Sequence, residues 1–327
     1  MTTLTVRDLT ATFTGPAGPV RAVDGVSFEI GDGEIIGLVG ESGSGKSVTL
    51  RSLLRMLRPP GTVSGSVVWN GVDLLALPEA KLRAVRGGEI AMIFQEPMTA
   101  LNPVLTVFQQ IDETLATHTD LSKAARKARA VDLLDLVGIP AATERLDHYP
   151  HEFSGGMRQR VMIAIALAGE PRLLLADEPT TALDVTIQDQ ILKLIVDLRD
   201  RLGMSVILVT HDLGVVAQTC SRVAVMYAGR IVESGSVASL FAEPHHPYTR
   251  GLLGSVPRPG QERQPLLSID GTPPSLADMP QGCAFHPRCS FKTEICTAER
   301  PPLASIAPGR LVACFHHEVV AAAGLSR

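Results

Sequence analysis

The sequence predicts an α/β fold: a core with a mixed β-sheet, an inserted helical subdomain and a small cysteine-rich C-terminal extension. Three observations support this prediction. The apolar run Ile35–Val39 ends in a glycine-rich loop that leads into a helical pattern, two later apolar runs flank another helical pattern, and four of the five cysteines lie at or after Cys283. Buried strands that alternate with helices are typical of sheets whose neighbouring strands run parallel.

Composition favours a folded protein for which nucleic acid is not a main partner. The 327 residues are 45% hydrophobic, which is enough for a substantial core. The 30 basic and 34 acidic residues give a formal charge of −4, and no long run of one sign is present to follow a nucleic-acid backbone. The start, Met1–Thr10, is polar, and no apolar segment approaches the length of a membrane span. We therefore expect a protein that is neither secreted nor integral to a membrane.

The first part of the chain is expected to alternate short strands with turns. Strands are expected at Thr3–Val6, Val26–Ile30, Ile35–Val39 and Ile90–Phe94. After the glycine-rich loop, Leu50, Leu53, Leu54 and Leu57 fall on one face of a helix that Pro59 and Pro60 end. A hairpin is expected at Val67–Val72, because Asn70-Gly71 is a favoured two-residue turn.

The middle of the chain is expected to hold the helical subdomain, at about residues 97–168. Leu101–Leu146 are mainly helical and polar in pattern, and Ala124–Val137 form an amphipathic helix. Strands at Leu173–Ala176 and Val206–Thr210 then flank a helix at Val185–Leu202. We place a domain boundary after residue 256, so that residues 1–256 form the main domain and 257–327 the extension, whose connector Pro257–Gly282 carries six prolines.

The strongest motif is the glycine-rich loop of residues 40–47, which fits the pattern G-x-x-x-x-G-K-[ST] between a strand and a helix. In this pattern backbone N–H groups surround phosphate oxygens, the lysine reaches the β- and γ-phosphates, and the serine hydroxyl ligates Mg²⁺. The fold class is therefore that of the P-loop NTPases. The candidate nucleotide-binding residues here are Gly40, Ser42, Gly43, Ser44, Gly45, Lys46, Ser47 and Val48.

A second motif is the apolar run Leu173–Ala176 that ends in Asp177 and Glu178. A carboxylate at the tip of such a strand can meet the metal ion of a bound nucleotide, so Asp177 would hold Mg²⁺, and Glu178 would orient and polarise the attacking water. Taken alone, two acids at a strand end are more often simply solvated. The phosphate-loop pattern upstream favours the functional interpretation.

Ser154-Gly155-Gly156-Met157, preceded by Phe153, stands at the expected start of an apolar helix. A serine and two glycines at a helix start can bind an anion or only cap the helix. The segment resembles the signature of ATP-binding-cassette (ABC) proteins, Leu-Ser-Gly-Gly-Gln, with Phe153 in place of the leucine and Met157 in place of the glutamine. The motifs occur in the order of that family over Leu4–Val237.

The resemblance implies roles for further residues. Phe13 matches the aromatic residue that stacks on adenine, although it is also an ordinary strand aromatic, and Gln95 matches the glutamine that senses Mg²⁺. Asp184 ends a loop that resembles the one crossing the dimer interface, and His211 matches the histidine at the γ-phosphate. Glu178, His211 and Lys46 are then the catalytic candidates, and Ser47, Gln95 and Asp177 the magnesium candidates. Two cassettes would meet head to tail, with ATP between one phosphate loop and the partner's Ser154–Gly156.

The tail resembles the C-terminal extension of oligopeptide and dipeptide importer ATPases, at Pro244–Leu253 and Cys283–Cys289. This resemblance implies ATP hydrolysis that powers peptide import, peripheral attachment at the cytoplasmic face of the bacterial inner membrane, two transmembrane permease subunits, a second related ABC ATPase and an external solute-binding protein. The imported solute could instead be a nickel chelate or glutathione. The alternative protein classes are an exporter subunit, a soluble ABC ATPase that is not coupled to transport and a metal-sensing module.

The cysteine cluster predicts a metal centre, since four thiols in a short tail of a cytosolic chain are more typical of metal binding than of disulfides. Cys283, Cys289, Cys296 and Cys314 are separated by five, six and seventeen residues. This spacing lacks the tight pairs of zinc ribbons, and together with the resemblance it favours a [4Fe–4S] cluster, with Zn²⁺ as the alternative. Cys220 lies outside the cluster and is expected to be a buried small hydrophobic residue.

Overall fold

The computed structural model describes residues 2–15, 18–255 and 269–324. The chain divides into two compact units, each built from stretches that are separated in sequence. The first unit comprises Met1–Ile30, Ile35–Leu75 and Thr210–Arg327, and the second comprises Gly31–Glu34 and Ala76–Val209. Among the described residues no helix is long and apolar enough to cross a membrane.

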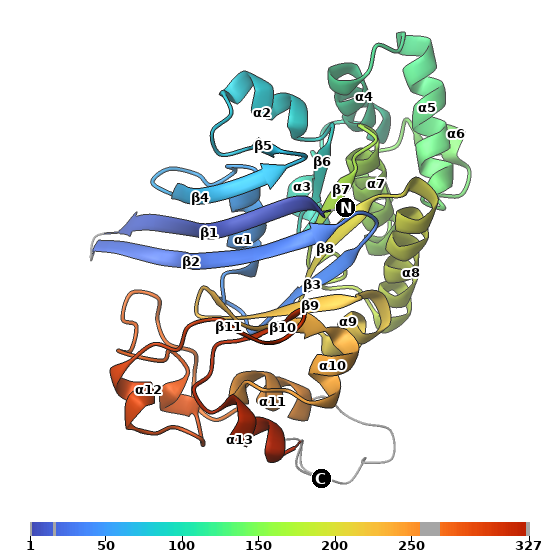
Figure 1. Ribbon diagram of the computed structural model, residues 1–327. Helices are drawn as coiled ribbons and strands as arrows, with labels where there is room; N and C mark the ends of the chain where they lie inside the picture. The colour runs from blue at the N-terminus through green and yellow to red at the C-terminus, as the bar shows by residue number, and fades with distance from the viewer. Residues whose placement is uncertain (1, 16–17, 256–268, 325–327) are drawn as a thin grey trace. The chain divides into compact units, whose positions relative to one another are not determined.

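The first unit contains a four-stranded sheet in the order β2-β1-β4-β5. Its strands are β1 (Thr2–Gly15), β2 (Gly18–Gly31), β4 (Thr62–Trp69) and β5 (Val72–Asp73). β1 pairs antiparallel with β4, and Figure 1 shows β1 and β2 as two long neighbouring strands. Apolar side chains of this sheet, such as Leu4, Leu9 and Trp69, are buried. The sheet therefore presents one face to a core, as an antiparallel sheet commonly does.

The first unit also contributes five strands, in the order β11-β12-β10-β9-β3, to the larger sheet of the chain. These strands are β3 (Ile35–Val39), β9 (Arg222–Tyr227), β10 (Arg230–Ser236), β11 (Ala304–Ala307) and β12 (Arg310–Val312). β3 and β9 are parallel, whereas β10 runs antiparallel to β9 and to β12. The sheet is therefore mixed, as predicted, and the C-terminal extension adds its outer strands.

Helices of the first unit cover this mixed sheet and the tail. They are α1 (Lys46–Leu53), α9 (Leu213–Thr219), α10 (Val237–Ala242), α11 (Pro247–Gly254), α12 (Glu294–Ala298) and α13 (His317–Ala322), with a 3₁₀ turn at His286–Arg288. One apolar cluster joins the sheet to the tail, because Val225, Tyr227, Tyr248 and Phe285 are all buried in it. The tail thus shares a core with the strand next to β3.

The second unit is a parallel sheet with the helical subdomain. β7 (Leu173–Asp177) pairs in parallel with β6 (Ile90–Ile93) and with β8 (Ser205–Thr210). The helices are α2 (Glu79–Val85), α3 (Pro97–Ala100), α4 (Val107–His118), α5 (Lys123–Leu136), α6 (Ala142–Arg145), α7 (Gly155–Leu167) and α8 (Val185–Leu202). A 3₁₀ turn at Pro150–Glu152 precedes α7. α7 contacts α3, α4, α5, α8 and β6, so it is the central helix of this unit (Figure 1).

Several predicted elements are confirmed. The strand Ile35–Val39 and the helix Val185–Leu202 have the predicted bounds, and α5 differs from its predicted bounds by one residue at each end. Asn70 and Gly71 have φ values of 47° and 83°, the positive values that a type I′ turn requires.

The first two strands are much longer than predicted. β1 continues past Val6 through an irregularity: Asp8 has a φ of 47°, and the register against β4 shifts between Arg7 and Thr10. Leu4 and Val6 are buried before the shift, and Leu9 and Ala11 after it. A bulge of this kind moves the buried set by one residue, which interrupts the period of two along the sequence. Of the predicted connector Pro257–Gly282, residues 257–268 lie outside the described residues.

Candidate functional site

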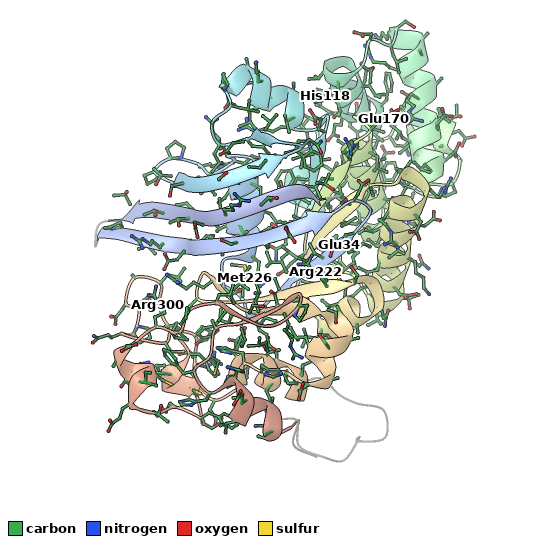
Figure 2. The ribbon with its side chains drawn as sticks, in the orientation of Figure 1. Glu34, His118, Glu170, Arg222, Met226 and Arg300 are labelled. Carbon is green, nitrogen blue, oxygen red and sulfur yellow. The ribbon has the colours of Figure 1, made fainter. Side chains whose placement is uncertain are left out.

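The phosphate-loop candidate joins β3 to α1 in the first unit, as the motif requires. Gly40, Gly43 and Gly45 have φ values of 153°, 78° and 101°, which side chains with a Cβ rarely adopt. A Cβ at Gly40 would collide with the carbonyl oxygen of Met226, a residue labelled in Figure 2, and one at Gly45 would lie 2.5 Å from the Ala22 carbonyl oxygen. The loop is therefore a close-fitting backbone cradle that only glycine permits, and such a cradle suits phosphate oxygens.

Lys46 is folded over this loop. Its side chain is buried, and its Nζ donates to the carbonyl oxygens of Gly40 at 2.7 Å and Glu41 at 2.9 Å. Ser44 is buried as well, and its carbonyl oxygen accepts from the backbone N–H of Gly229 at 3.0 Å. An ammonium group held at the mouth of a cradle of N–H groups forms a site for an anion.

The remaining first-unit candidates lie in and before α1, on β1 and directly after β8. Ser47 and Val48 are half-buried in the first turn of α1, and Ser42 is exposed. Phe13 is half-buried near the end of β1, beside Gly61. His211 is exposed and follows β8 directly, and Asp212 after it caps α9 by accepting from the N–H groups of Gly214 and Val215. His211 therefore stands at the carboxyl end of a strand, as predicted.

In the second unit the structure brings Gln95 and Glu178 together. The Gln95 side chain donates from Nε2 to Glu178 Oε2 at 3.0 Å, and the Thr181 hydroxyl donates to the same oxygen at 2.9 Å. Glu178 has a φ of 46°, in the left-handed region, and its N–H donates to the Val209 carbonyl oxygen at 3.0 Å. Asp177, the last residue of β7, is fully buried. Two donors therefore fix the position of the Glu178 carboxylate beside the end of β7.

The signature candidate Ser154–Gly156 forms the start of α7 beside the start of α8. Ser154 is exposed, and its hydroxyl accepts from the Met157 N–H at 3.3 Å as the N-cap. A Cβ at Gly156 would lie 2.6 Å from Ile187 Cγ2, so the glycine is required for this packing. Asp184 caps α8 by accepting from the Ile187 N–H at 2.9 Å, and the next residue, Val185, is 84% exposed. The two motifs predicted to meet a partner cassette therefore share one exposed surface.

The four tail cysteines line one small pocket. Its lining includes Cys283, Cys289, Cys296 and Cys314 with Phe285, Phe291 and Phe315. Burial raises the pKa of Cys283, Cys289 and Cys314, the last to about 12. Within the described ranges of the chain, no group of three or more His, Cys, Asp or Glu side chains is arranged to hold a metal ion. The arrangement thus does not by itself support the predicted [4Fe–4S] cluster, which stays a hypothesis.

A parallel strand, a cradle of glycines, a buried lysine and a helix in that order define a P-loop nucleoside triphosphatase. Comparison with protein families refines this class. Residues 23–181 match the family "ABC transporter", and residues 232–296 match the family "Oligopeptide/dipeptide transporter, C-terminal region". The chain belongs to the ABC transporter family as an ATP-binding subunit, and it is an ATPase of the ABC type.

Similar proteins extend over nearly the whole chain. The oligopeptide transport ATP-binding protein OppD of Salmonella typhimurium is 51% identical over 95% of this chain and 93% of its own. The dipeptide transport ATP-binding protein DppD of Escherichia coli is 47% identical over 97% of each chain. Among solved structures, the dimeric ATP-binding cassette MJ0796, in a post-hydrolysis state with ADP and phosphate, is 29% identical with a TM-score of 0.64, covering 72% of this chain and 98% of its own.

Sequence reasoning missed the contacts that hold the phosphate loop from outside. Glu41 binds Arg288 and Tyr248, although Arg288 is 247 residues away in sequence. It also missed the Thr181 hydroxyl on Glu178. Arg288 lies inside the segment Cys283–Cys289, but nothing in a periodic or motif pattern pairs it with a particular carboxylate.

Proposed function

We propose that this chain hydrolyses ATP to power the import of peptides across the bacterial inner membrane. The observation that carries the proposal is the presence, in one chain, of an ABC ATPase region and a C-terminal region of the oligopeptide/dipeptide type. Relatives named for oligopeptide and dipeptide transport align with nearly the whole chain and support it. ATP-driven uptake of peptides by the complex isolated through this chain is the experiment that tests it.

In the first unit, the loop residues Gly40–Ser47 would bind the phosphates of ATP. Lys46 would turn from the loop carbonyls to the β- and γ-phosphates, and the Ser47 hydroxyl would hold Mg²⁺. Phe13 would stack on adenine, and His211 would contact the γ-phosphate. Bound Mg²⁺ neutralises part of the phosphate charge.

In the second unit, Glu178 would orient and polarise the water that attacks the γ-phosphate of ATP. Gln95 and Thr181 both donate to Oε2 of Glu178, and these two hydrogen bonds fix the orientation of the carboxylate. A carboxylate in a fixed orientation can act as a general base. Gln95 and the buried Asp177 would complete the oxygen ligands of Mg²⁺, a hard cation that prefers such ligands.

The chain would act in a pair of cassettes, with a second, related ABC ATPase subunit as its partner. Ser154–Gly156 and Asp184 lie on an exposed surface of the second unit, where the N-terminus of α7 offers N–H groups to the partner's ATP. Two permease subunits in the membrane and an external solute-binding protein complete the importer. The ATPase would then lie at the cytoplasmic face of the membrane, with residues 1–256 as the ATPase domain, the helical subdomain at about 97–168 and residues 257–327 as the extension.

We also propose that the cysteine pocket holds an iron–sulfur cluster, with Zn²⁺ as the alternative. Four thiols around one apolar pocket support the proposal. A single tetrahedral zinc needs its sulfurs at about 2.3 Å from one point, whereas a cluster accepts thiolates spread around a larger body.

Anaerobic purification of the full chain tests the cysteine pocket. We expect iron and sulfide with a broad visible absorption, and loss of both in Cys289→Ser, because a missing thiolate leaves one iron without its protein ligand. Cys220→Ser is the matched control, since Cys220 does not line the pocket, and burial raises the pKa of its thiol to about 11. A colourless protein with one tightly bound zinc, or with no metal, would exclude the cluster.

A further inference from the structure

Glu41, the second residue of the phosphate loop, is held through each of its polar groups. Its backbone N–H donates to the Tyr248 hydroxyl at 2.7 Å, and its carbonyl oxygen accepts from Lys46 Nζ at 2.9 Å. Its two carboxylate oxygens accept from the two terminal nitrogens of Arg288, at 2.8 Å (Nη1 to Oε2) and 3.1 Å (Nη2 to Oε1). Because its N–H, its carbonyl oxygen and its carboxylate are all hydrogen-bonded, Glu41 has little conformational freedom. These contacts therefore fix the backbone position at the start of the phosphate loop.

Arg288 is itself rigidly placed. Its side chain is only 4% exposed, and it also donates to the carbonyl oxygens of Asp270 at 2.9 Å and Ile269 at 3.2 Å and to the Tyr227 hydroxyl at 3.5 Å. The hydrogen bonds to Glu41, more than any other contact, raise its pKa further above the ordinary value, so it stays charged. A two-bond pair between guanidinium and carboxylate fixes direction as well as distance.

An aromatic cluster positions both partners of Glu41. The ring centroids of Tyr227 and Tyr248 lie 4.6 Å apart, and that of Phe285 lies 5.2 Å from Tyr227 and 5.6 Å from Tyr248. The guanidinium of Arg288 lies 5.9 Å from the ring centroids of Tyr227 and Phe285. Tyr248 comes from α11 and Arg288 from the 3₁₀ turn of the tail, so the C-terminal region holds the loop through one packed cluster.

The negative charge of Glu41 explains why ATP binding requires the contact with Arg288. The loop offers N–H groups and Lys46 to the phosphates of ATP, and a carboxylate in the same loop repels them. The Glu41 side chain is 29% exposed, so its charge is only partly screened by water. Arg288 places an opposite charge at hydrogen-bonding distance from both oxygens, which cancels most of this repulsion.

We propose that Arg288 is a positioning residue for ATP binding: it neutralises and fixes Glu41, and Tyr248 holds the backbone of the same residue. The C-terminal extension thereby sets the affinity of the phosphate loop for ATP. This inference rests on the proposed role of the loop in binding ATP. Arg288 acts through Glu41, since it contacts the loop at that side chain.

The test is the dissociation constant of ATP for the purified full chain. We expect Arg288→Met to raise it about tenfold, which corresponds to about 1.4 kcal/mol, because Glu41 then faces the phosphates without its counter-charge. Glu41→Gln alone should lower the constant, because the carboxylate that repels the phosphates is gone while Arg288 keeps its charge. The double variant should recover most of the affinity lost in Arg288→Met, a non-additive result that loss of general stability does not produce.

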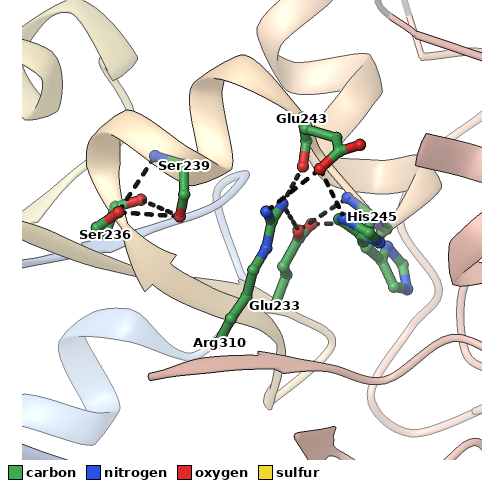
Figure 3. A network of polar contacts seen from close by, with 7 residues as sticks. Glu233, Ser236, Ser239, Glu243, His245 and Arg310 are labelled. Carbon is green, nitrogen blue, oxygen red and sulfur yellow. Dashed lines mark hydrogen bonds and ion pairs between the residues drawn. The ribbon is translucent and has the colours of Figure 1, made fainter. Parts of the chain in front are cut away.

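Arg310→Met is the matched control, because Arg310 is also a buried arginine of the extension. It pairs with Glu233 at 3.5 Å and with Glu243, in the network that Figure 3 shows, rather than with Glu41. We expect its ATP affinity to stay near that of the unmodified chain once thermal unfolding confirms that it is folded. Tyr248→Phe keeps the aromatic ring and removes the acceptor for the Glu41 N–H, so it should weaken ATP binding by about two- to tenfold.

Three results would overturn the proposal: unchanged affinity in Arg288→Met, a double variant as weak as Arg288→Met, or an equal loss in Arg310→Met. Lys46→Ala tests the loop itself. If Lys46→Ala still binds ATP normally, the loop does not bind ATP as proposed. If Lys46→Ala loses ATP binding but Arg288→Met keeps normal affinity, only the proposed role of Arg288 is rejected. In the assembled complex, Arg288→Met should raise KM for ATP and leave kcat nearly unchanged, since Arg288 does not touch the reacting atoms.

Discussion

Glu178→Gln should bind ATP and hydrolyse it about 10²- to 10⁴-fold more slowly, which is the range expected for loss of general-base catalysis. Glutamine has the same shape, and its amide oxygen can still accept hydrogen bonds from Gln95 and Thr181, so the local structure is preserved. What is lost is the negative charge that polarises the attacking water. The phosphate loop is unchanged, so ATP should still bind.

Steady-state hydrolysis by the assembled complex, measured beside ATP binding, checks this expectation. Glu170→Gln is a control of the same chemistry, because Glu170 is an exposed glutamate of the second unit that pairs with Arg129 at 3.0 Å. Exposed pairs of this kind contribute little. Near-normal hydrolysis by Glu178→Gln would remove Glu178 from the catalytic role.

Ser154→Arg should reduce hydrolysis by the complex by about 10²-fold or more, because a displacement of about 1 Å at a reacting centre has effects of that size. Ser154 is exposed at the start of α7, where the proposed partner cassette would present its ATP. A long side chain there would prevent close approach of the two cassettes. Binding of ATP to the isolated chain should be unaffected, since the phosphate loop is that of the same chain.

Ser154→Ala separates the effect of bulk from that of capping. Both substitutions remove the hydroxyl that accepts from the Met157 N–H, and a lost N-cap costs about 0.5–2 kcal/mol of stability. Only the arginine adds bulk at the surface. If the isolated Ser154→Arg chain fails to bind ATP, then Ser154 belongs to the pocket of its own chain, and the head-to-tail arrangement is wrong.

Elements with a complete local signal could be predicted from the sequence. The helix Val185–Leu202 has an N-cap at Asp184 and ends at Gly203, whose φ is 65°, so both of its ends are marked by residue type. The strand Ile35–Val39 is apolar throughout and leads into the glycine loop. The motif residues were found for the same reason, because chemistry requires particular residues at a fixed spacing.

Features that depend on distant contacts could not be predicted. The bulge at Asp8 is visible only once β1 is paired with β4, and β12 has three residues with no distinctive pattern. The pair Arg288–Glu41 joins positions 247 residues apart, and its specificity comes from the packing of Tyr227, Tyr248 and Phe285. The sequence marks each of these residues as ordinary, and only the fold brings them to the phosphate loop.

The central claim is that ATP hydrolysis by this chain powers the import of peptides. The most direct measurement reconstitutes the complex isolated through this chain into vesicles, with the solute-binding protein and labelled di- and oligopeptides on the side that corresponds to the outside. We expect peptide to accumulate on the ATPase side when ATP is supplied. No accumulation should occur with ADP, or with ATP when the complex contains the Glu178→Gln chain. Hydrolysis that is unaffected by peptide and solute-binding protein, together with no ATP-dependent peptide accumulation, would contradict the account.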